Sequence, residues 1–217
     1  MTPTHHPDPD DLLSYASGTA EEWRAVVIAC HLTYCPDCRS EVGALEDLGG
    51  VLLDTLEDEA GLLAPSLPPA AAPERVAKPK TTYSDSMVAR SIPRPLHAHF
   101  KEATPAWRFL APGLKHVPIS LTVGDMPARI IQFKPGFVIP DHRHNGTEMV
   151  LVLDGVLEDT VTKDVFRTGD LSRRDEATGR HGNVVTSADP CVCLVVNDGA
   201  IDPSTMWGKL LKALTGL

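Results

Sequence analysis

The segment His31-x-x-x-Cys35-x-x-Cys38 brings an imidazole and two thiols together where one expected helix ends and the next begins. Thiolate and imidazole donors together select Zn²⁺ in a closed tetrahedral site, which needs a fourth ligand. His5 and His6 are the two candidates, and we favour His6 because it lies closer to the start of the first helix. The alternative is a redox pair of cysteines, but the chain around them lacks the βαβ pattern of such proteins. We therefore predict a zinc site.

A second group of possible ligands lies in the C-terminal half of the chain. On a β-strand His142 and His144 point to the same face, and Glu148 returns on the next strand, so the three side chains converge. Their spacing matches the first cupin motif, which reads Gly136-x5-His142-x-His144-x3-Glu148-x6-Gly155 in this sequence. His181 is the expected fourth ligand, although the second cupin motif around it is only partly present. Such donors suit Zn²⁺, Mn²⁺, Fe²⁺ or Ni²⁺; a cupin that has lost its metal is the alternative.

The remaining three cysteines have no spacing typical of ligands. Cys30 lies on the apolar face of its expected helix, which predicts a small buried hydrophobe. Cys191 and Cys193 alternate along the expected strand PCVCLVV, so their sulfurs share one face. They are either an oxidisable pair that contributes to sensing or two small core side chains, and the apolar strand favours the second interpretation.

Two kinds of pattern position these residues. Apolar residues at helical spacing predict three N-terminal helices, over about residues 9–17, 19–34 and 36–56, with a capping box at Thr19-x-x-Glu22 opening the second. Later, short β-branched runs broken by Gly, Pro and Asp predict an all-β unit. We expect an α+β protein in two domains, a small N-terminal all-α zinc-binding helical bundle and a C-terminal all-β cupin barrel. The expected division is 1–62 for the zinc-binding domain, 63–97 for a Pro- and Ala-rich linker, 98–200 for the cupin and 201–217 for a C-terminal helical tail.

The net charge of −9 is concentrated in the N-terminal part. Residues 1–61 hold thirteen Asp and Glu against two Arg, a local charge of −11, so the rest of the chain carries about +2. Such an acidic unit repels phosphate backbones and attracts a basic protein, which disfavours direct binding to nucleic acid. The first residues have no signal-peptide pattern, and no window approaches the roughly 18 apolar residues of a membrane span. We expect a cytoplasmic protein without membrane contact.

Several of these segments resemble a known family. His6 together with HLTYCPDC is similar to the zinc-binding domain of bacterial anti-sigma factors, and YASGT and GALEDLGG resemble ChrR-type members, which carry a C-terminal cupin domain. The resemblance covers both expected domains and is weakest in the linker. It implies that the helical domain binds an extracytoplasmic-function sigma factor by wedging between its two DNA-contacting regions. It also favours Zn²⁺ in the cupin, and a signal such as singlet oxygen.

We therefore expect an anti-sigma factor and not an enzyme. It would sequester the sigma factor through the zinc domain and release it when the cupin domain senses an oxidative signal. The alternative is a metal-dependent cupin dioxygenase or isomerase with an accessory zinc domain, which needs an open coordination position and a substrate-lined pocket. The attached zinc motif and the acidic N-terminal part weigh against that alternative. The oligomeric state stays open.

Overall fold

Three helices precede the β-structure. The computed structural model describes residues 2–55, 92–101, 105–123, 126–199, 201–203 and 209. The N-terminal part folds into α1 (Pro9–Ala16), α2 (Glu22–Tyr34) and α3 (Pro36–Thr55), close to the expected ranges. Prolines open α1 and α3, where a missing N–H costs no intrahelical hydrogen bond.

The capping box predicted at the start of α2 is wrong. The helix begins at Glu22, and its N-cap residue Glu21 makes no capping hydrogen bond with its side chain. The Thr19 hydroxyl instead donates to the Ser14 carbonyl, at 3.4 Å. Gly18 has a positive φ of 71° and ends α1 in a tight turn. Thr19 therefore faces the helix before it and not the helix after it.

The all-β unit is confirmed, and its expected barrel takes the form of two packed antiparallel sheets. One sheet has the strand order β1-β2-β3-β10-β5-β8, and the other has the order β11-β4-β9-β6-β7. The strands are β1 (Arg108–Ala111), β2 (Leu114–Val123), β3 (Met126–Phe133), β4 (Val138–His144), β5 (Glu148–Asp154), β6 (Val156–Asp159), β7 (Val165–Arg167), β8 (Leu171–Arg174), β9 (His181–Val185), β10 (Cys191–Asn197) and β11 (Ile201–Pro203).

Strand β10 is buried on both faces. Cys191 and Cys193 face the layer between the two sheets, and their sulfur atoms lie 3.7 Å apart. Val192, Leu194 and Val196 belong to a second apolar layer on the outer face of the same sheet. This alternation follows from the two-residue period of a strand. The two cysteines are fully buried, which confirms the prediction of small core side chains.

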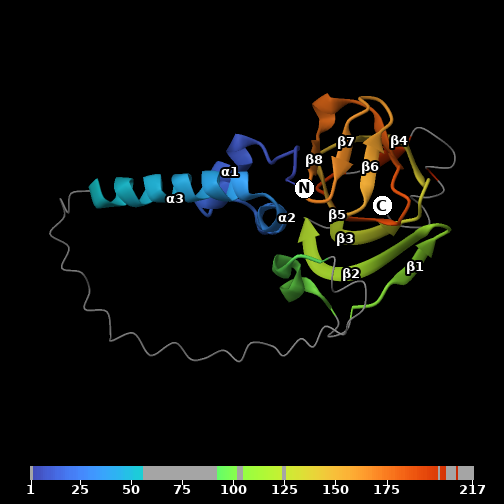
Figure 1. Cartoon of the computed structure of the whole chain (residues 1–217), viewed down its shortest axis with the longest axis horizontal. Coiled ribbons are helices and arrows are strands. Elements are labelled where there is room, and N and C mark those ends of the chain that lie inside the picture. The colour runs from blue at the N-terminus through green and yellow to red at the C-terminus, as the bar shows by residue number, and fades with distance from the viewer. Residues whose placement is uncertain are drawn as a thin grey trace.

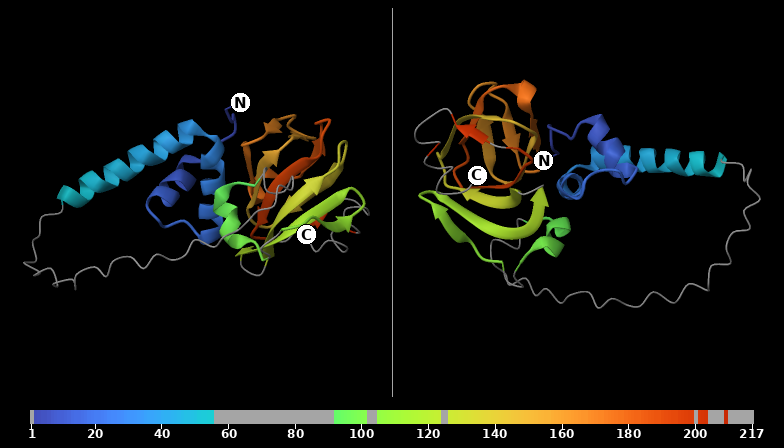
Figure 2. Two further views of the ribbon diagram at one scale, coloured as in Figure 1. Left: turned by 60° about the horizontal axis from the view of Figure 1, so that its bottom comes forward. Right: turned by 180° about the vertical axis from the view of Figure 1, so that it is seen from behind.

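The outer apolar layer of the six-stranded sheet is covered by helices that are distant in sequence. Trp23, Val27 and Cys30 of α2 lie in one cluster with Leu96 of η1 (Arg94–His99) and with Leu151 of β5. Cys30 is fully buried there, as predicted. Figure 1 shows α2 beside the sandwich and α3 extending away from it, and Figure 2 shows the same arrangement from two further sides. The N-terminal helices and the sandwich thus share a core.

Two of the expected segment boundaries can be located in the fold. The division between linker and cupin at residue 97 falls inside η1, whose Leu96 is fully buried. The expected helical tail starts with strand β11, which pairs with β4. Residues 56–62 of the expected zinc-binding domain, 63–91 of the expected linker, and all but 201–203 and 209 of the tail lie outside the described residues. In the part of the chain that is described, no helix combines the length and the apolar character needed to cross a membrane.

Two candidate metal centres

The first cluster gathers donors from the segment before α1 and from the junction of α2 with α3. His6 precedes α1, His31 lies in the last turn of α2, and Cys35 and Cys38 lie at the junction with α3. His6 Nδ1 is 3.4 Å from Cys35 Sγ and 3.3 Å from Cys38 Sγ. His31 Nε2 is 3.4 Å from Cys38 Sγ. With Zn–N and Zn–S bonds of about 2.0–2.3 Å, the corners of a tetrahedral site lie about 3.5 Å apart, so the spacing fits zinc.

Protonation in this cluster also favours a cation. His31 Nδ1 lies 2.8 Å from the Gly169 carbonyl, which only accepts, so Nδ1 carries the proton and Nε2 faces the thiols. Burial lowers the pKa of His31, which keeps the ring neutral. Burial and the neighbouring Cys35 raise the pKa of Cys38 to about 12. Ionisation of the Cys38 thiol therefore needs a positive charge beside it, and Zn²⁺ would supply it.

The two histidines before α1 divide between two environments. His6 joins the thiols, whereas the His5 ring lies 4.4 Å from the Phe166 ring, with Nδ1 3.6 Å from Asp170 Oδ2. The geometry therefore selects His6 as the fourth member of the cluster, which is the favoured one of the two candidates.

The second cluster lies inside the sandwich. His142 and His144 stand on β4, Glu148 opens β5 and His181 opens β9, where it pairs in register with His142. Glu148 Oε2 is 3.2 Å from His144 Nε2 and 3.4 Å from His181 Nε2. All four side chains are buried, and their donor atoms lie within 4.8 Å of one another. The eight predicted site residues are thus divided between two compact groups.

Glu148 carries the negative charge of the second cluster. Burial alone would raise its pKa, but the hydrogen bonds with His144 and His181 outweigh burial and lower the pKa below its ordinary value of 4.5. His142 Nδ1 donates to the Pro140 carbonyl at 2.8 Å, which leaves Nε2 with a free lone pair. An ionised carboxylate among imidazoles is a donor set that suits a divalent cation.

The His144 ring carries its proton on a different nitrogen from the His142 ring. The Asn197 amide nitrogen lies 3.3 Å from His144 Nδ1, while its oxygen accepts from the Gly199 N–H at 3.0 Å. Because an amide nitrogen only donates, the His144 proton sits on Nε2, beside Glu148. His181 Nδ1 is buried without a hydrogen-bond partner. A metal at this site must displace the Nε2 proton of His144.

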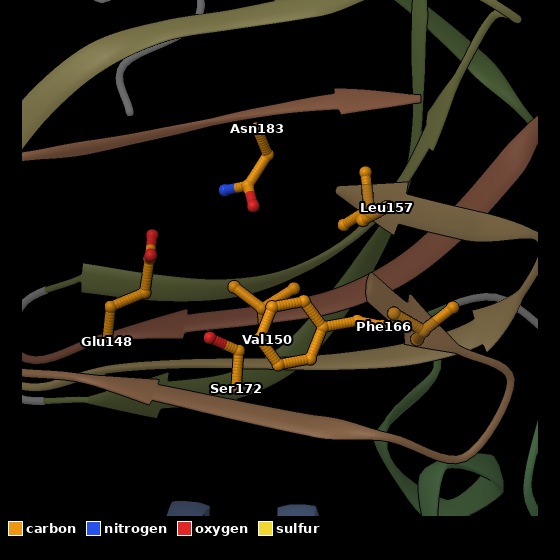
Figure 3. Close-up of a pocket in the computed structure, with 7 residues that line it drawn as sticks. Glu148, Val150, Leu157, Phe166, Ser172 and Asn183 are labelled. Carbon is orange, nitrogen blue, oxygen red and sulfur yellow. The ribbon is translucent and has the colours of Figure 1, made fainter. Parts of the chain in front are cut away.

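A small cavity adjoins Glu148 between the two sheets. Figure 3 shows Glu148 and Asn183 directed into the same space, with Val150 and Phe166 alongside. Its volume is about 10 Å³, roughly the space of one water molecule. Binding pockets for small molecules measure about 300–1,000 Å³. The cavity therefore does not hold a substrate without rearrangement.

Two supporting residues were missed by the sequence reasoning. A polar residue that ends an apolar strand was a usable signal for Asn197. No local signal exists for Gly169, because the histidine that it contacts is 138 residues away in the sequence. Such contacts are set by tertiary packing alone.

Comparison with known proteins matches both parts of the chain. A family model described as the ChrR cupin-like domain matches residues 97–201. The anti-sigma-E factor ChrR of Cereibacter sphaeroides is 31% identical over 227 residues, which cover 98% of each chain. The crystal structure of Rhodobacter sphaeroides SigE in complex with the anti-sigma ChrR matches with a TM-score of 0.65 and 29% identity, over 91% of this chain and 100% of that one. The chain therefore belongs to the ChrR family of anti-sigma factors.

Proposed function

We propose that the N-terminal helices of this protein sequester an extracytoplasmic-function sigma factor and that the cupin-like sandwich controls its release. The observation that carries the proposal is the similarity to ChrR, which spans helices and sandwich together, and the matching ChrR structure is a complex with SigE. Such a complex acts in the cytoplasm, where sigma factors meet RNA polymerase. We also propose that the signal is an oxidative one, such as singlet oxygen.

The surface of α3 supports a protein partner. Leu48, Val51 and Leu52 are 54%, 59% and 58% exposed, and their spacing of three and four residues places them on one helix face. Contiguous exposed apolar side chains mark interaction sites. The helices carry most of the net negative charge, which complements the basic DNA-contacting regions of a sigma factor.

Zinc would hold the helical unit together. Its own apolar core is small, because Leu12, Ile28 and Val42 form it together with Cys35 and Cys38. A Zn²⁺ bound by His6, His31, Cys35 and Cys38 would join the start of α1 to the junction of α2 and α3.

The second cluster would hold another divalent cation, for which we propose Zn²⁺. Its ligands would be His142, His144, Glu148 and His181. The small cavity beside Glu148 supports a role without turnover.

Co-purification of the full chain with an extracytoplasmic-function sigma factor of the same organism tests the proposal. We expect a complex that inhibits transcription from the cognate promoter and that dissociates when a zinc chelator is added. Leu48→Glu should weaken the complex roughly 30-fold, about 2 kcal/mol, because it places a charge in the apolar face. Phe109→Glu is the control, since Phe109 is 75% exposed on strand β1 of the sandwich. Absence of a complex in every condition would favour a cupin enzyme instead.

A further inference from the structure

The turn between β7 and β8 of the sandwich lies directly under the N-terminal cluster. The turn contains Gly169 and Asp170, which contact residues on both sides of the cluster. We propose that this turn is a positioning element of the N-terminal cluster, so that the sandwich sets how tightly the cluster holds zinc. The inference rests on the proposed zinc site and adds a second part of the chain to it.

Gly169 orients one ligand ring. Its carbonyl accepts from His31 Nδ1 at 2.8 Å, which fixes the ring and directs Nε2 toward the thiols. Hydrogen bonds of this kind to the outer nitrogen of a ligand histidine set its tautomer and its basicity. Gly169 has a positive φ of 93°, and a Cβ at this position would lie 2.7 Å from Tyr34 Cβ and 2.8 Å from Pro3 Cγ. Only glycine allows this close approach.

Asp170 holds the segment that carries the other ligand ring. Its side chain is almost fully buried, and Oδ1 accepts from the backbone N–H groups of Thr4 (2.6 Å) and His5 (3.0 Å). Oδ2 accepts from the Arg167 N–H at 2.7 Å, inside the turn. The Leu171 N–H donates to the His5 carbonyl at 3.1 Å. The backbone is thereby fixed one residue before His6.

These contacts hold a segment that lies outside the helices. His6 precedes α1 and is exposed, whereas the other three members of the cluster are buried on the helices. Without these contacts, a non-helical segment would lose conformational entropy each time the site closed. With Asp170 in place, that entropy is already lost when the protein folds, so His6 is preorganised to bind.

The first test is Asp170→Asn in the full chain. The amide nitrogen of asparagine must face either the two N–H groups of the N-terminal segment or the N–H of Arg167, so one set of hydrogen bonds is lost. Cobalt binding reports only on the cysteine-containing cluster, through thiolate-to-cobalt charge-transfer absorption, and displacement of cobalt by zinc then gives the zinc affinity. We expect the affinity to fall roughly 10–100-fold. Asp189→Asn, in an exposed loop between β9 and β10, should bind as the wild type does.

A second pair of variants leaves the sandwich unchanged. Thr4→Pro removes one of the two N–H groups that donate to Asp170 Oδ1, whereas Thr4→Ala keeps both. Weaker zinc binding in Thr4→Pro but not in Thr4→Ala, with the metal content of the second cluster and the near-ultraviolet circular dichroism unchanged, would support the proposal even if Asp170→Asn misfolds. Zinc affinity within twofold of the wild type in Asp170→Asn or Thr4→Pro would overturn it. A wild-type chain without the charge-transfer absorption would instead refute the zinc site itself.

Discussion

The two clusters have the same number of donors but differ in how far they are prepared for a metal. In the N-terminal cluster the His31 proton is fixed on Nδ1 by a carbonyl, so Nε2 is ready to bind. In the sandwich the His144 proton sits on Nε2 and donates to Glu148, because Asn197 occupies Nδ1. Glu148 of the second cluster thus has two imidazole partners without a metal, whereas the thiols of the first cluster would need a cation beside them to ionise. The difference suggests a structural metal in the first and an exchangeable metal in the second.

The largest expected effect is that of removing one thiol from the first cluster. Cys35→Ala should unfold much of the helical unit, because structural zinc contributes on the order of 10–16 kcal/mol to such small domains. Far-ultraviolet circular dichroism should show the loss of helix. Cys30→Ala is the matched control, since this cysteine is equally buried on α2 but faces the shared core and not the cluster. Equal loss of helix in both variants would contradict a structural zinc.

Chelator titration should separate the two sites. We expect the metal of the second cluster to leave at a chelator concentration on the order of 100-fold lower than that which removes N-terminal zinc, because thiolate ligands bind Zn²⁺ tightly in closed sites. Elemental analysis follows total metal, and a thiol reagent follows the first cluster. All five cysteines are free and buried, so thiol reactivity should rise only in the second stage. Reaction of the thiols in the first stage would contradict this order of metal release.

Gly169→Ala should affect only the first cluster. A positive φ costs alanine about 1 kcal/mol or more, and the clash with Tyr34 and Pro3 adds to that, so we expect about 2–3 kcal/mol lower stability and faster zinc release. Gly179→Ala is the control, because its φ of 82° imposes similar strain but nothing lies within 4 Å of the added Cβ. Urea unfolding and zinc transfer to a chelator measure the two effects. Similar zinc release from both variants would show that the close approach is unimportant.

Glu148→Gln should affect only the second cluster. Its pKa is lowered in the folded protein, so its stabilising effect is fully present above the ordinary value of 4.5 and is lost as the pH falls through the lower folded value. In metal-free protein at pH 7 we expect Glu148→Gln to be about 1–3 kcal/mol less stable than the wild type, and the difference should narrow only below about pH 4.5. Glu158→Gln, which loses only a surface ion pair with Lys163, should change stability little at any pH. If the difference in stability between the wild type and Glu148→Gln disappeared already near pH 6, this would contradict an ionised Glu148.

Much of this arrangement could be predicted from local patterns. The spacing of His31, Cys35 and Cys38 follows from one helix end and one helix start, and the positions of His142, His144 and Glu148 follow from strand alternation. His181 lies far along the chain with only part of its motif present, and the fold brings it into register with His142. The capping box failed because Thr19 had a nearer acceptor in the preceding turn.

What the sequence determined by itself is the chemistry of each cluster, because ligand type and short-range spacing are properties of contiguous segments. Only the tertiary structure decided which histidine of the pair before α1 faces the thiols, where the protons of His31 and His144 sit, and that α2 shares its core with the six-stranded sheet. Each of these depends on contacts between residues 29 or more positions apart in the sequence. Local periodicity carries no information about such contacts, since they are fixed by how preformed surfaces pack.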